Sequence, residues 1–105
     1  MTANTAKPIL VNGQWVQTSS TEPIYCPYSG DLLATVCQAE AQHIEQTLIS
    51  VKQAAQELAT IPAYVRAQAL LHIANGITAR HEEFSKTLSQ EAGKPLTDAR
   101  REIDR

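Results

Sequence analysis

The sequence predicts antiparallel β-hairpins followed by three to four α-helices. Before residue 42, short apolar runs alternate with turn residues, which is typical of strands joined by tight connections. After residue 42, apolar residues recur with the period of an amphipathic helix. Proline and glycine fall between the helical stretches, where helices end and begin. The composition agrees: 43% of the 105 residues are hydrophobic but only 5% are aromatic, so the core must be mainly aliphatic.

The first hairpin is predicted at residues 9–16. Two apolar runs, Ile-Leu-Val and Gln-Trp-Val, flank Asn12 and Gly13. Asn-Gly supplies the two positive-φ residues of a type I′ turn, whose twist matches that of paired strands. Trp15, the single tryptophan of the chain, is expected to act as a packing anchor.

A second hairpin is predicted after a polar joint at residues 18–21. Residues 23–25 and 32–37 are its expected strands. The Pro-Tyr-Ser-Gly run at residues 27–30 has the residue types of a tight turn.

The first helix is predicted to start near Gln42 and to stop before Pro62. A proline disfavours helical backbone in the residue before it and lacks an amide donor, yet it suits the first turn of a new helix. The apolar stripe of the first helix recurs at helical spacing and consists of Ile44, Leu48, Val51, Ala55 and Leu58.

A second helix is predicted from Pro62, and two interpretations exist for its end. Its stripe continues through Phe84 and Leu88, which allows one helix as far as residue 92. The sequence Arg-His-Glu-Glu at residues 80–83 instead indicates that one helix ends and that another begins with acidic residues in its first turn. This break is favoured. The stripe of the second helix consists of Leu70, Ile73, Ala74 and Ile77.

The last helix is predicted to open at Pro95. Gly93 suits a left-handed C-cap of the preceding helix. Near-neighbour ion pairs are expected between Asp98 and Arg101 and between Arg100 and Asp104. Its apolar stripe of Leu96, Ala99 and Ile103 is expected to be exposed and to drive self-association of the C-terminal helices.

Charge and composition exclude several classes of protein. Nine basic and eleven acidic residues are interspersed and give a net charge of −2, which argues against nucleic-acid binding. No apolar stretch approaches the length of a signal sequence or a membrane span, so a cytoplasmic protein is expected. In the predicted second hairpin, Cys26 and Cys37 lie too far apart along the strands for a disulfide, and both thiols are expected to be free.

The residues with chemical potential do not form a recognised site. Gly93 and Lys94 lack the glycine and the hydroxyl residue of a phosphate-binding loop, and the four glycines are too widely spaced for a dinucleotide fingerprint. Neither cysteine has an evident activating partner, and the adjacent pair Glu82-Glu83 points in two directions. The histidines lack metal-ligand spacing and are expected to be solvated, namely His43, His72 and His81. No catalytic, cofactor-binding or metal residue is therefore assigned.

Four ordered blocks carry a family resemblance. Residues 91–103, EAGKPLTDARREI, resemble the helix-turn-helix entry to the cofactor domain of NAD(P)-dependent aldehyde dehydrogenases. Residues 11–16 resemble the opening hairpin of that family, residues 27–31 its Asn-Pro-Tyr-Ser-Gly-Glu turn, and residues 66–74 its second helix. Cys26 departs from the pattern, because the family usually has Asn before this turn.

The resemblance implies an α/β parent with a Rossmann-type cofactor domain. In such an enzyme a cysteine thiolate attacks the aldehyde, hydride passes to NAD or NADP, and a glutamate activates water, but none of these groups maps onto this chain. Residues 1–8 are expected to be a disordered tail, and residues 9–105 the N-terminal part of the cofactor-binding domain, truncated at its C-terminal end. The fragment is expected to bind no cofactor, to be structural and inactive, to pair with the remainder of the enzyme, and to form a homo-oligomer. The alternative is a self-contained helical interaction module without catalytic activity.

Overall fold

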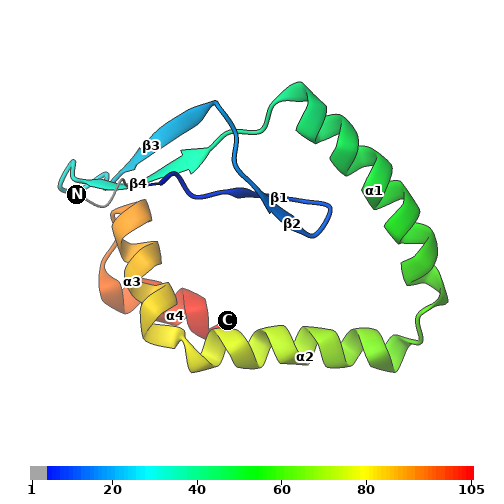
Figure 1. Cartoon of the computed structure of the whole chain (residues 1–105). Helices are drawn as coiled ribbons and strands as arrows, with labels where there is room; N and C mark the ends of the chain where they lie inside the picture. Colours follow the sequence, from blue (N-terminus) through cyan, green and yellow to red (C-terminus); the bar gives the residue numbers. More distant parts are fainter. Residues whose placement is uncertain (1–4) are drawn as a thin grey trace. The chain divides into compact units, whose positions relative to one another are not determined.

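The computed structural model describes residues 5–105, which form two compact units. One unit holds the chain up to Ile24 together with Ala34–Thr60, and the other holds Tyr25–Leu33 together with Ile61–Arg105. The observed order of strands before helices confirms the predicted arrangement (Figure 1). No helix among the described residues has the length and apolar character that a membrane crossing requires.

The first unit begins with the hairpin of β1 (Ile9–Val11) and β2 (Gln14–Val16). Their antiparallel register pairs Ile9 with Val16 and Val11 with Gln14. Asn12 and Gly13 have φ angles of 49° and 74°, the positive values that the Asn-Gly turn requires. The predicted hairpin is confirmed, but Trp15 is 72% exposed, so its expected role as a packing anchor is wrong for this chain.

The second hairpin consists of β3 (Thr21–Tyr25) and β4 (Leu32–Cys37). Lys7 pairs with β4 in a parallel bridge: its N–H donates to the Thr35 carbonyl at 2.8 Å, and its carbonyl accepts from the Cys37 N–H at 2.8 Å. Backbone pairing therefore starts before Ile9, because the edge of β4 offers free hydrogen-bonding groups. Of the predicted tail, residues 1–4 lie outside the described residues.

The helix α1 (Ala41–Thr60) completes the first unit and contacts β1. The buried side chains of this unit are Val11, Cys37 and His43. Most of the predicted stripe of α1 is exposed, including Leu48 and Val51.

The second unit contains three helices, α2 (Ala63–Ala79), α3 (His81–Ala92) and α4 (Leu96–Asp104). Pro62 precedes α2 with extended backbone, as the residue at a helix start does. The helices α2 and α3 meet at Arg80, whose φ and ψ of −112° and 25° interrupt the helix. This confirms the predicted break and gives four helices among residues 5–105.

The helices α3 and α4 pack closely against each other (Figure 1). Ser85 on α3 and Ala99 on α4 are both 0% exposed, and such small side chains let two helix backbones approach. Leu96 and Ile103 are half-buried. The expectation that this stripe is exposed was wrong, because α3 supplies the covering surface within the chain.

Candidate functional site

The corner between α3 and α4 is closed by local hydrogen bonds. Gly93 ends α3 with φ 63° and ψ 30°, which confirms the left-handed C-cap. The amides of Gly93 and Lys94 donate to the Ser89 carbonyl, and the Ser89 hydroxyl donates to the Lys94 carbonyl at 2.7 Å. The end of α3 thus fixes the path of the chain into α4.

The tip of the second hairpin lies against this corner. A Cβ atom placed on Gly93 would lie 3.2 Å from the Pro27 Cβ and 3.3 Å from the Tyr28 amide nitrogen. Glycine is therefore required twice, for its positive φ and for the close approach of the turn. The contact leaves a groove of 470 Å³ lined by Cys26, Tyr28, Ser29, Ser89, Gln90, Gly93, Lys94, Pro95 and Leu96.

Cys26 is the one thiol on this groove, and its turn favours the thiolate. The Ser29 hydroxyl and the backbone amides of Ser29 and Tyr28 lower the pKa of Cys26 below its ordinary value of 9.0. Partial desolvation and the negative charge of Asp31 act in the opposite direction and raise it. The expectation that Cys26 has no activating partner is wrong, because groups of its own turn lower its pKa.

Cys26 nevertheless lacks the surroundings of a catalytic nucleophile. No histidine lines the groove, and its only cation is Lys94. A nucleophilic thiol ordinarily needs an adjacent base or an orienting acid–base pair. The other thiol, Cys37, is buried in the first unit, and both cysteines are free, as expected.

Charged side chains join α3 to α4. Arg100 donates to the Glu82 carboxylate through Nε at 2.7 Å and through a terminal nitrogen at 3.0 Å. This pairing lowers the pKa of Glu82 and raises that of Arg100. His81 Nε2 lies 2.8 Å from an Asp104 carboxylate oxygen.

The predicted pair of Arg100 with Asp104 is therefore wrong. Both residues find partners on α3 rather than within α4, because packing of the two helices brings the acidic first turn of α3 beside them. The predicted pair of Asp98 and Arg101 is present at 3.7 Å.

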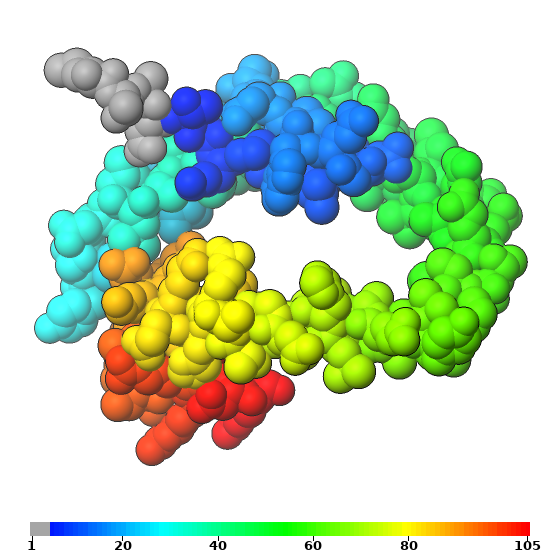
Figure 2. All heavy atoms as spheres, turned by 60° about the horizontal axis from the view of Figure 1, so that its bottom comes forward, coloured from blue at the N-terminus to red at the C-terminus, as the bar shows by residue number. Residues whose placement is uncertain are grey.

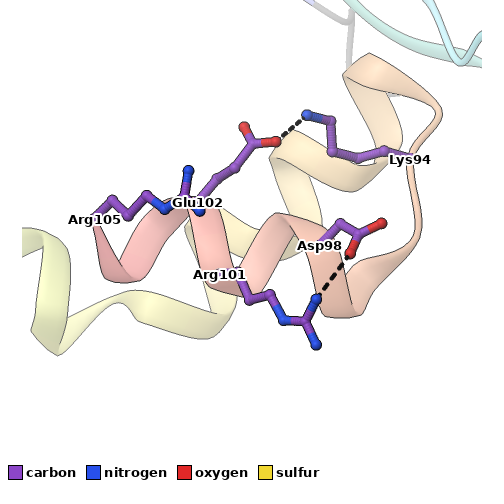
Figure 3. A pocket seen from close by; sticks show the side chains of 5 residues that line it. All are labelled: Lys94, Asp98, Arg101, Glu102 and Arg105. Atoms are coloured by element: carbon purple, nitrogen blue, oxygen red, sulfur yellow. Dashed lines mark hydrogen bonds and ion pairs between the residues drawn. The ribbon is translucent and has the colours of Figure 1, made fainter.

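A hollow of 390 Å³ lies on α4 and is lined by five charged residues (Figure 3). Lys94 is paired with Glu102, and Arg101 points toward Asp98 (Figure 3). Each carboxylate is thus satisfied by a cation of the chain. The residues around the hollow form surface ion pairs, and such pairs ordinarily contribute little to stability.

The histidines do not come together. His43 is buried rather than solvated, and its Nδ1 accepts from the Glu40 amide at 3.0 Å. His81 is half-buried against α4, and only His72 is exposed as expected. Among residues 5–105, no group of three histidine, cysteine or acidic side chains is placed to hold a metal ion.

The described residues also do not fit a dinucleotide. Gly13 and Gly30 have positive φ, but each serves a hairpin turn, and Gly93 is covered by Pro27. A pyrophosphate site needs closely spaced glycines at a helix N-terminus, with free amides directed at the phosphates. The positive-φ glycines of this chain precede no helix directly, since Pro95 occupies the start of α4.

Comparison with known proteins places the chain in a family. The model of the aldehyde dehydrogenase family matches residues 15–105, so the chain belongs to this family. An aldehyde-dehydrogenase-like protein of Sinorhizobium fredii is 32% identical over 88 residues, which are 82% of this chain and 17% of that protein. Malonate-semialdehyde dehydrogenase 1 of Oceanobacillus iheyensis is 31% identical over 97 residues, which are 90% of this chain and 20% of that enzyme.

Solved structures agree with the family assignment. NADP-dependent glyceraldehyde-3-phosphate dehydrogenase of Bacillus halodurans, crystallised with NADP, superposes with a TM-score of 0.90 at 25% identity. The match covers 94% of this chain and 21% of that enzyme. The chain thus spans about a fifth of the length of its relatives and corresponds to an N-terminal fragment of an aldehyde dehydrogenase.

Proposed function

We propose that this chain is the structural N-terminal segment of an NAD(P)-dependent aldehyde dehydrogenase. The full-length enzyme would oxidise an aldehyde to a carboxylate through a cysteine thiohemiacetal, whereas the segment alone is inactive. The observation that carries this proposal is the family match over residues 15–105 in a chain that spans only a fifth of its relatives. Solved structures similar to the chain contain NAD or NADP, which supports either dinucleotide as the cofactor of the parent.

The geometry supports a structural role for residues 9–105 as part of the cofactor-binding domain. The corner at Gly93 consists of the C-cap of α3, the hairpin turn packed against it, and the ion pairs that join α3 to α4. These contacts hold the path of the backbone and do not form a substrate site. No described residue has the surroundings of a nucleophile, of a general base or of a phosphate cradle. The alternative of a self-contained interaction module is not favoured, because the family match extends over both units.

Localisation and assembly follow from the same proposal. We place the parent in the cytoplasm, a compartment that keeps thiols reduced, and the two free cysteines are consistent with this. We also propose that the parent is a homo-oligomer. The large apolar side chains exposed on the segment are consistent with extensive burial in a larger assembly.

Two measurements test the proposal. Calorimetric titration of the 105-residue chain with NAD and with NADP should give no saturable binding with a dissociation constant below about 1 mM, a weak affinity on the usual scale. The second measurement uses malonate-semialdehyde dehydrogenase 1 of Oceanobacillus iheyensis, from which the segment that matches this chain has been removed. With malonate semialdehyde as the hydride donor, this trimmed enzyme should be inactive alone and should reduce NAD or NADP when this chain is added. Binding of either dinucleotide by the chain alone, or no activity of the mixture, would count against the proposal.

A further inference from the structure

The helix α2 carries little charge on its surface. It contains one charged residue, Arg66, in 17 residues. Its neutral polar residues Gln68, His72, Asn75 and Thr78 lie within about a third of the helix circumference, the polar arc, as successive residues are rotated by about 100°. A surface helix ordinarily carries a polar face as wide as its apolar stripe, whereas a helix that is apolar nearly all round is buried in a larger protein.

Two different sides of α2 carry large apolar side chains. The Leu70 face consists of Leu70 and Ile73, and the Leu71 face consists of Tyr64 and Leu71. Leu70 and Leu71 are neighbours in sequence and therefore point about 100° apart. They are 68% and 62% exposed, so within this chain neither face is covered.

The second unit covers only one end of α2. Ile77, near the junction with α3, is half-buried, and α3 and α4 both contact the helix. Within this unit, the rest of α2 extends away from α3 and α4 as a row one helix thick (Figure 2). Among the described residues of this unit, none forms a second layer over the part of α2 that bears Tyr64, Leu70 and Leu71.

We infer that α2 is an interior helix of the parent enzyme, covered on both the Leu70 face and the Leu71 face by polypeptide that lies outside this chain. This inference rests on the proposed function. Four-fifths of the length of the relatives lies outside the match, which is enough chain to supply two covering layers. A second copy of the chain, related by a two-fold axis, would use one self-complementary patch and would leave the other face in water.

The test uses the trimmed Oceanobacillus iheyensis enzyme described above as the probe. In the chain alone, amide hydrogen exchange should be fast at residues 63–75, and addition of the probe should slow it. Leu70→Ser and Leu71→Ser, made separately, should each weaken association with the probe at least tenfold in a pull-down titration. His72→Ser, on the polar arc and not three or four residues from Leu70 or Leu71, is the matched control and should leave association unchanged, and circular dichroism should show equal helix content in all four proteins.

The outcomes separate the possibilities. If only one of the two leucine variants loses association with the probe, the probe covers only one face of α2, and the inference is overturned. Equal association of all variants, or slow exchange of α2 in a dimer of the chain alone, also overturns it. If the probe associates in the predicted manner but oxidises no aldehyde, the proposed function fails while the burial of α2 stands.

Discussion

At the scale of single residues, Gly93 shows how a local signal and a tertiary contact converge on one position. The helix end before Pro95 was predicted from the sequence, because a left-handed cap is a local feature of a glycine followed closely by a proline. The contact of Pro27 with Gly93 was not predictable, since 66 positions separate the two residues. The same limit explains Cys26: its lowered pKa depends on a turn conformation that the residue types alone do not specify.

Replacing Gly93 by alanine should destabilise the fold. The added Cβ would meet the Pro27 side chain at 3.2 Å and would place a non-glycine residue at φ 63°, which costs about 1 kcal/mol or more. Gly76→Ala should act in the opposite sense by up to about 1 kcal/mol, because Gly76 lies inside α2 with nothing within 4 Å of its would-be Cβ. Urea denaturation of both variants measures the difference, and shifts of the same sign would contradict the assignment of the helix end.

Cys26 should be alkylated by iodoacetamide at lower pH than an ordinary thiol, because hydrogen bonds from its turn lower its pKa below 9.0. Ser29→Ala removes the largest of these bonds and should move the alkylation profile to higher pH. Asp31→Asn removes an opposing charge and should move it to lower pH. Mass spectrometry identifies the labelled peptide, and an unchanged profile in both variants would show that the turn does not tune this thiol.

At the scale of elements, turns and caps were predictable and partners were not. The Asn-Gly hairpin, the joint at Pro62 and the break at Arg80 each follow from residues adjacent in sequence, and the structure has all three. The burial of the α4 stripe, by contrast, depends on how α3 folds back beside it. Patterns of apolar residues show that a helix has a face to bury but do not identify the surface that covers it.

The pairing of Glu82 with Arg100 should make the α3–α4 pair sensitive to acid. The pKa of Glu82 is lowered in the folded chain, so its contribution to stability is fully present above about pH 4.5 and is lost as the pH falls through the folded-state value. Glu82→Gln should therefore lower the free energy of unfolding at neutral pH and reduce the further loss on acidification. The difference between the two proteins should vanish at low pH.

Urea denaturation at several pH values, followed by circular dichroism, measures this effect. Glu45→Gln on α1 is the control variant for the removal of one carboxylate. An effect of Glu82→Gln that persists undiminished at low pH would mean that the side chain acts through packing rather than charge.

At the scale of the whole molecule, the described chain buries few side chains for its length. Only five residues between 5 and 105 are less than about a tenth exposed, and three of them are apolar, namely Val11, Cys37 and Ala99. A domain of about 100 residues ordinarily buries close to two-thirds of the surface of its unfolded chain. Local hydrogen bonds and turns therefore hold the elements together more than a common core does, as expected of a segment whose covering layers lie elsewhere in the parent.

The isolated chain should therefore unfold with a shallow dependence on urea. The slope of the free energy against denaturant follows the surface exposed on unfolding and is typically about 1–3 kcal/mol/M for small proteins, so we expect a value below about 1 kcal/mol/M. Addition of the trimmed Oceanobacillus iheyensis enzyme should raise the midpoint, because a partner that binds only the folded state stabilises it by mass action. Circular dichroism follows the loss of the helices. A steep transition of the chain alone, unaffected by the partner, would indicate that the chain possesses a complete core and would support the self-contained module instead.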